Sequence, residues 1–184
     1  MSTLKTNAIQ TTGGKPLLHS TGSILQVVST YKGDHFQTNS TSWTDITGLS
    51  ASITPSNSGN KILVWCSMGA AGVRQDNGDH GNGIRTLRNG STSNKCNGTA
   101  AGSRDISSFK GTGWSYNADH NPGGLGFHAL DDPSSTSQLT YKIQVKCQES
   151  GYRFTLNGPD NNGNTAYVYA ARQMSSLTLM EVSA

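Results

Sequence analysis

Alternation of apolar and polar residues is clearest in residues 141–147. The odd positions of this segment are Tyr, Ile, Val and Cys, and the even positions are Lys, Gln and Lys. Successive side chains of a β-strand point to opposite faces of the sheet, so this period of two predicts an antiparallel strand that is buried on one face. The alternation returns at Tyr152, Phe154 and Leu156. The short polar segment 148–151 between the two runs predicts a hairpin.

Further segments of strand length are separated by turn-forming residues, including six Asn-Gly pairs. Asn and Gly tolerate the positive φ angles of tight turns. The other candidate strands are residues 24–30, 44–46, 50–54, 61–68, 83–88, 166–170 and 176–182. About eight to ten short strands at this spacing predict an all-β sandwich or barrel.

Composition supports an all-β chain. Ser, Thr, Asn and Gly fill 81 of the 184 positions. The polar side chains among them compete for the backbone hydrogen bonds of a helix, and Gly loses the most entropy when a helix fixes it. A chain of this length can bury a core of its own, so we expect a single main domain.

The N-terminal segment differs from the rest of the chain. It contains a Gly-Gly pair, a proline and a few isolated apolar residues, which are Leu4, Ile9, Leu17 and Leu18. These are too few to form a core. We therefore expect residues 1–22 to be an arm that becomes ordered by packing on another surface, and residues 23–184 to be the β-sandwich head.

Charge and hydropathy argue against two classes of partner. Only 14% of the residues are charged, the net charge is +3, and the Lys and Arg residues are scattered. Nucleic-acid binding requires clustered basic residues, so we expect no nucleic-acid partner. The longest apolar runs, such as residues 62–66, are too short to cross a bilayer, and polar residues follow Met1. We expect no membrane partner and no signal peptide.

Cysteine usage argues against disulfide bonds and zinc. The chain has three cysteines, Cys66, Cys96 and Cys147, and no C-x-x-C pair. An odd number without paired spacing is typical neither of a disulfide framework nor of a zinc site. Because Cys66 and Cys147 lie in apolar candidate strands, we expect them to be buried free thiols.

One acidic segment has residues of the type that bind calcium. Residues 76–82 bring Asp76 and Asp79 close to several amide side chains. The segment misses the spacing of an EF-hand loop and lacks its later bidentate Glu. A solvated turn is the favoured interpretation. We expect no metal and no cofactor, with Asp76 and Asp79 as weak candidates for metal binding.

Catalytic motifs are also missing from the sequence. His120 and His128 precede Asp131 and Asp132, but their spacing matches no metal-ligand pattern. The chain has two Glu residues, and four of its nine Asp residues stand beside Gly or Asn. Neither a nucleophile elbow, nor H-E-x-x-H, nor a phosphate-binding loop is present. We therefore expect that the protein is not an enzyme.

Two long polar segments, 75–82 and 94–133, predict loops, which often carry function when they are this long. Aromatic residues in the second segment can stack on sugar rings or anchor a protein contact. The candidates for recognition contacts are Trp114, Tyr116, Phe109 and Phe127, together with His120 and His128. For Phe109 and Phe127, packing under the loop is the alternative, and it is the favoured interpretation.

Several strand and turn motifs follow one another along the chain: GSILQVVST (22–30), WTDITGLSASITPSNSGNKILV (43–64), IRTLRNGS (84–91), AAGSR (100–104), TYKIQVK (140–146) and SSLTLMEV (175–182). In this order they resemble structural proteins of tailed bacteriophages, especially those from marine and cyanobacterial sources. In addition, LKTNAIQTTGGKPLL (4–18) is similar to the attachment segments that begin many phage fibre proteins. The resemblance spans nearly all of the chain from Gly22 onward.

The resemblance implies a jelly-roll-like β-sandwich that trimerises and is carried on the virion by its N-terminal arm. Leu4, Ile9, Leu17 and Leu18 would then attach the arm to tail or capsid proteins. Such a head would serve as a fibre head or knob that contacts a host-surface glycan through its long loops. The alternatives are a capsid decoration protein that stabilises the shell and, less favoured, a glycan-cleaving enzyme. The expected location is the virion, assembled in the bacterial cytoplasm.

Overall fold

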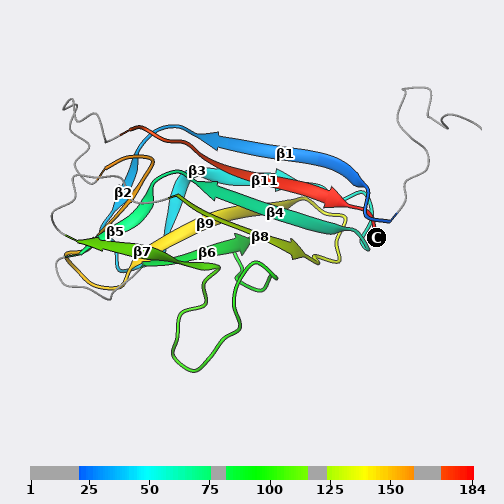
Figure 1. Cartoon of the computed structure of the whole chain (residues 1–184). Coiled ribbons are helices and arrows are strands. Elements are labelled where there is room, and N and C mark those ends of the chain that lie inside the picture. Colours follow the sequence, from blue (N-terminus) through cyan, green and yellow to red (C-terminus); the bar gives the residue numbers. More distant parts are fainter. Residues whose placement is uncertain (1–20, 76–81, 116–123, 160–170) are drawn as a thin grey trace, which may run out of the picture.

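The computed structural model describes residues 21–75, 82–115, 124–159 and 171–184, and for residues 73–75 and 111–115 it describes the backbone only. These residues form eleven strands and no helix. The strands lie in two sheets that pack face to face (Figure 1). The predicted all-β, sandwich-like fold is therefore confirmed. Within the described residues, no helix is long and apolar enough to cross a membrane.

The four-stranded sheet faces the reader in Figure 1 and is called the front sheet below. Its strands follow one another from top to bottom and pair antiparallel throughout. In spatial order they are β1 (Ile24–Lys32), β11 (Ser175–Val182), β4 (Lys61–Met68) and β8 (Leu125–Asp131). The first and last strands of the described chain are thus neighbours.

The seven-stranded sheet lies behind and is called the back sheet. Its pairs are antiparallel except for one parallel pair, β5 with β7. In spatial order the strands are β2 (Phe36–Thr38), β10 (Arg153–Leu156), β5 (Ala71–Gln75), β7 (Phe109–Ser115), β6 (Asn82–Arg88), β9 (Leu139–Cys147) and β3 (Thr44–Ile53).

The core lies between the sheets and follows the alternation of the sequence. Ile62, Val64 and Cys66 of β4 are completely buried, as are the inward residues of β9, whose burial alternates along the strand. Burial of each such aliphatic side chain contributes about 1.5–3 kcal/mol. Cys66 and Cys147 are buried free thiols, as predicted, and Cys96 is a third.

Three sequence expectations are corrected by the strand arrangement. Residues 44–46 and 50–54 belong largely to one bent strand, β3. The expected loop 94–133 contains strands β7 and β8. The hairpin at 148–151 is wrong, because β9 already has β3 and β6 on its two edges, so β10 pairs with β2 and β5 instead. The candidate strand 166–170 lies outside the described residues.

The side chain of Asn97 bonds the backbone of β6 beyond the point where β7 stops pairing with it. β7 pairs with β6 only as far as Ile84. Beyond that point, the Thr86 N–H donates to Asn97 Oδ1 at 3.1 Å, and Asn97 Nδ2 donates to the Thr86 carbonyl at 2.7 Å. The Asn97 amide thus replaces a missing strand, and this gives residues 94–97 a structural role.

The buried carboxylate of Glu181 stabilises the front sheet near the C-terminal end of β11. Glu181 is only 1% exposed. Its Oε1 accepts hydrogen bonds from Ser56 N, Ser56 Oγ and Asn60 Nδ2 at 2.6–2.7 Å, and its Oε2 accepts one from Gln26 Nε2 at 2.6 Å. These bonds fasten the turn before β4 to β11 and β1.

Candidate binding site

A bulge in β3 shapes the outer surface of the back sheet. Asp45 pairs with Gln144 and Ser50 pairs with Lys142, so four residues of β3 face a single residue of β9. The bulge turns at Gly48, whose φ of +90° favours glycine over other residues. Thr30 Oγ1 of β1 donates to the Gly48 carbonyl at 3.1 Å, which holds the bulge against the front sheet.

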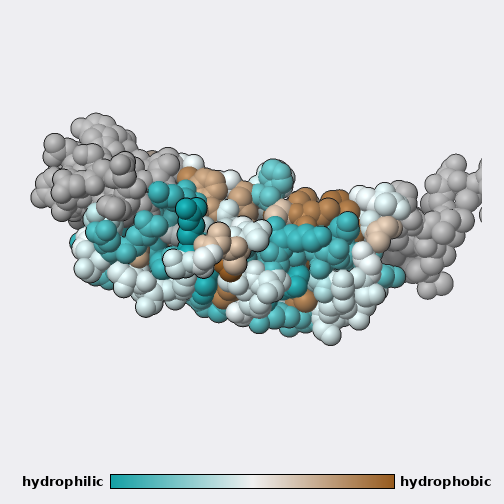
Figure 2. All heavy atoms as spheres, turned by 90° about the horizontal axis from the view of Figure 1, so that it is seen from below, coloured by the Kyte–Doolittle hydropathy of each residue, from teal (hydrophilic) through white to brown (hydrophobic). Residues whose placement is uncertain are grey.

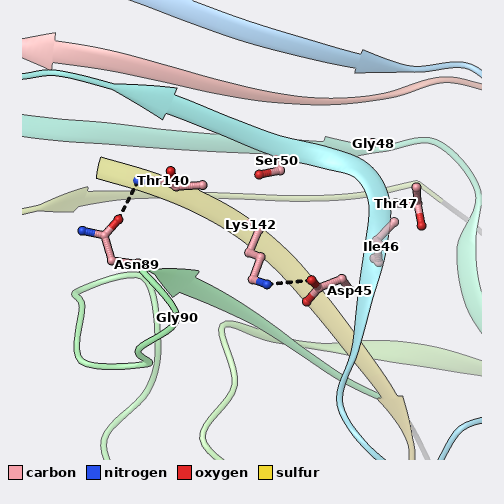
Figure 3. Close-up of a pocket in the computed structure, with 9 residues that line it drawn as sticks. All are labelled: Asp45, Ile46, Thr47, Gly48, Ser50, Asn89, Gly90, Thr140 and Lys142. Atoms are coloured by element: carbon pink, nitrogen blue, oxygen red, sulfur yellow. Dashed lines mark hydrogen bonds and ion pairs between the residues drawn. The ribbon is translucent and has the colours of Figure 1, made fainter. Parts of the chain in front are cut away.

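The bulge forms one wall of a groove of about 570 Å³ (Figure 3). The opposite wall is the turn at Asn89 and Gly90, and β9 forms the floor with Thr140 and Lys142. Asn89 and Gly90 both have positive φ, of 49° and 82°, as the Asn-Gly pattern predicts for a tight turn. A groove of this volume lies within the size range of small-molecule sites.

An ion pair occupies the floor of the groove. Lys142 Nζ lies 2.6 Å from Asp45 Oδ2, and Gln144 Nε2 donates to Asp45 Oδ1 at 2.5 Å. In Figure 3 the two charged side chains point toward each other. The hydrogen bond from Lys142 holds the pKa of Asp45 below its ordinary value of 3.8. Each charge therefore neutralises the other, and the groove offers paired charges rather than a free acid.

The walls add hydroxyl and amide groups. The Thr140 N–H donates to Asn89 Oδ1 at 2.8 Å, which fixes the Asn89 side chain (Figure 3). The hydroxyls of Thr140 and Ser52 lie 2.8 Å apart, and Thr47 and Ser50 add further hydroxyls from the bulge. Such groups both donate and accept hydrogen bonds, so the groove is suited to a ligand with many hydroxyls.

A half-buried tryptophan stands next to the groove on the same surface. The Arg85 guanidinium lies over the Trp43 ring, 4.2 Å from its centroid, and a Cβ on Gly83 would come within 2.7 Å of that ring. Arg85 Nε donates to Gln144 Oε1 at 2.8 Å. A chain of polar contacts therefore runs from Trp43 through Arg85 and Gln144 to Asp45, and it fixes the groove floor relative to the tryptophan.

Phe109 and Phe127 are not loop residues. Both are partly buried and pack against the core, Phe109 from β7 in the back sheet and Phe127 from β8 in the front sheet. Packing, the alternative considered from the sequence, is therefore their role, although the strands rather than a loop position them. They do not form one recognition cluster.

His128, Asp131 and Asp132, which are close in the sequence, do not form one group in the structure. His128 is exposed on the outer face of the front sheet, where its ring lies 6.2 Å from that of Trp65. Asp131 is 1% exposed and points into the sandwich. Asp132 is exposed. Adjacent positions on a strand face opposite ways, and this separates the histidine from the buried acid.

Asp131 is fully engaged in a buried network. Its Oδ2 accepts from Tyr141 Oη at 2.7 Å and from Arg88 Nη1 at 2.5 Å, and its Oδ1 accepts from the Lys95 N–H at 2.9 Å. The network connects the front sheet to the back sheet. Asp131 is therefore a buried structural acid. Across the described ranges, no three His, Cys, Asp or Glu side chains gather as metal ligands would.

The other candidate residues from the sequence are outside what the structure describes. For Trp114, only the backbone in β7 is described. The rest lie wholly outside the described residues: Tyr116, His120, Asp76, Asp79, Leu4, Ile9, Leu17 and Leu18. Sequence patterns missed Trp43, Asp45 and Lys142, and the Asn89–Gly90 pair was the one signal that pointed to the groove.

Comparison of the sequence with protein-family models and with curated proteins gives no match.

Proposed function

We propose that this chain is the recognition head of a bacteriophage virion appendage, a homotrimer that its N-terminal arm, residues 1–22, attaches to the particle. The support from sequence is the order of strand and turn motifs that resemble phage structural proteins. The support from structure is a β-sandwich with extensive backbone pairing, a stable scaffold on which a recognition surface can be held.

The observation that carries the proposal is the groove on the back sheet. Its hydroxyls, its Asn89 amide and its neutralised Asp45–Lys142 pair match a hydroxyl-rich, uncharged ligand. The proposed ligand is a glycan of the host surface. Three such grooves on one head would bind a repeated glycan more strongly than one, because the second and third contacts form at high effective concentration.

Binding rather than catalysis is favoured by the state of the acids. Asp131 and Glu181 are buried and saturated with hydrogen-bond donors, and Asp45 is paired with Lys142. Glycan cleavage requires two carboxyl groups placed on either side of the scissile bond, and one of them must be able to give up a proton. These three acids instead hold the fold and the groove floor.

Virion location is tested by a gold-labelled antibody against residues 94–133, imaged on intact particles. Label at the tail or on projecting fibres is the expected result. Label spread over the capsid would replace this proposal with capsid decoration, and particles lacking the protein should then lose resistance to heat or osmotic shock.

Ligand binding is tested by titrating the full chain with fragments of host envelope polysaccharide in a calorimeter. Lys142→Ala should weaken binding about tenfold or more, since it removes the cation that neutralises Asp45 in the groove. Lys110→Ala is the matched control, because Lys110 is an exposed lysine on β7 and does not line the groove. Equal affinities of both variants and the wild type would remove the groove from the proposal.

A further inference from the structure

Large exposed hydrophobic side chains are concentrated on one face of the described molecule. Five of the six lie on strands of the front sheet, and the sixth, Met174, immediately precedes β11. The five are Ile24, Val27, Tyr31, Trp65 and Leu130, each at least 42% exposed. In Figure 2 the larger brown areas lie along the upper margin, on the side that faces the reader in Figure 1. Single exposed hydrophobic residues are ordinary, but a shared face marks an interaction surface.

Strand register aligns part of this surface into a row. Val27 of β1 pairs with Met180 of β11, Met180 with Leu63 of β4, and Leu63 with Leu130 of β8. All four side chains are exposed or half-buried. This apolar row, Val27–Met180–Leu63–Leu130, crosses the entire front sheet from edge to edge.

The row beside it also contains no Lys, Arg, Asp or Glu. It consists of Ser29, Thr178, Trp65 and His128, one from each strand. The hydroxyls of Ser29 and Thr178 lie 2.8 Å apart, and the Trp65 ring lies beside the His128 ring. Hydroxyls that satisfy each other and an aromatic pair are easily covered by another protein, since little hydration is lost.

The outer faces of the two sheets differ in how many charged residues they carry. The outward-facing residues of the four front strands include a single residue of the types Lys, Arg, Asp and Glu, which is Lys61. The back sheet instead carries Asp45, Arg85, Lys142 and Lys146 on its outer surface. When copies of one chain meet through the same surface, a charge near the symmetry axis meets a like charge, so an apolar face with so few charged residues fits a second copy of this chain.

We propose that the outer face of the front sheet is the interface between copies of this chain. The apolar rows of neighbouring copies pack against one another around the symmetry axis. The groove lies on the opposite sheet, so this packing leaves every groove open to solvent. The interface is inferred from the front sheet itself, and only the number of three copies rests on the proposed function.

The mass of the full chain in solution tests the proposal. Light scattering after size-exclusion chromatography should give three times the 19.4 kDa of the single chain. Leu130→Asp and Val27→Lys each place a charge within the apolar row, and each should weaken association about a hundredfold or more. Ser52→Glu is the control, because it adds a charge at an exposed strand position on the back sheet. Circular dichroism should show all variants folded.

Each possible oligomeric state either supports or overturns the proposed interface. A wild-type monomer at roughly 100 μM would overturn the interface and would indicate that a different protein covers the face. Association that survives both front-sheet substitutions would overturn it as well. A wild-type dimer that both substitutions disrupt would support the interface and replace three copies by two. Glycan binding and virion location are measured separately, so their failure would leave this result unchanged.

Discussion

Replacing Glu181 by Gln keeps the size of the side chain and removes its charge. In the native protein, the two carboxylate oxygens accept four hydrogen bonds, from Gln26, Ser56 and Asn60. A Gln side chain turns one acceptor into an NH₂ group that faces donors. The lost charge-assisted bonds and a donor left without a partner should together lower the free energy of unfolding by about 2–4 kcal/mol.

The same change should alter how stability depends on pH. Burial raises the pKa of Glu181, but hydrogen bonds from Asn60, Gln26 and Ser56 outweigh burial and hold the pKa below its ordinary value of 4.5. The ionised carboxylate therefore stabilises the fold at neutral pH, and this contribution is lost as the pH falls from 4.5 through the lower folded pKa. The difference between wild type and Glu181→Gln should narrow over that range.

Urea unfolding at several pH values and thermal unfolding at pH 7, both followed by circular dichroism, measure these effects. At pH 7 the melting temperature of Glu181→Gln should lie about 5–15 °C below that of the wild type. The other glutamate of the chain, Glu149, is exposed, so Glu149→Gln is the matched control. A loss below about 0.5 kcal/mol at pH 7, or a difference that stays constant down to about pH 3, would refute the reasoning.

Three further predictions concern other buried or paired groups. Tyr141→Phe removes one donor from Asp131 and should cost about 1–2 kcal/mol in urea unfolding; an unchanged midpoint would show that the bond contributes nothing. Lys142→Ala removes the main cause of the lowered Asp45 pKa, so NMR titration should find that pKa raised toward 3.8. Burial raises the pKa of the Cys66 thiol to about 12, so iodoacetamide should label it only after unfolding.

The sequence predicted strands best where alternation was unbroken. Residues 61–68 form β4 with the expected bounds, and residues 141–147 lie within β9. Strand β8, Leu125–Asp131, also alternates, but Gly126 and the polar residues before it gave the segment the composition of a loop. Local composition misled there because pairing with β4 supplies the backbone hydrogen bonds that propensity alone does not.

The groove was beyond sequence reasoning for a physical reason. Asp45 and Lys142 are 97 positions apart, and the pairing of β3 with β9 brings them together. The bulge between Asp45 and Ser50 exists only relative to a partner strand, so Gly48 alone could not reveal it. The structural role of Asp131 was beyond sequence reasoning for the same reason, because its donors come from β6, β9 and the residue Lys95.

Because β11 is the last strand of the chain and lies between β1 and β4, the front sheet can form only after β11 has been synthesised. Every other described strand precedes β11 in the chain, yet β11 lies between β1 and β4. A polypeptide terminated before Ser175 would leave β1 with no neighbour in that sheet and would uncover one edge of β4. Prematurely ended products would therefore expose unpaired backbone to proteases and chaperones.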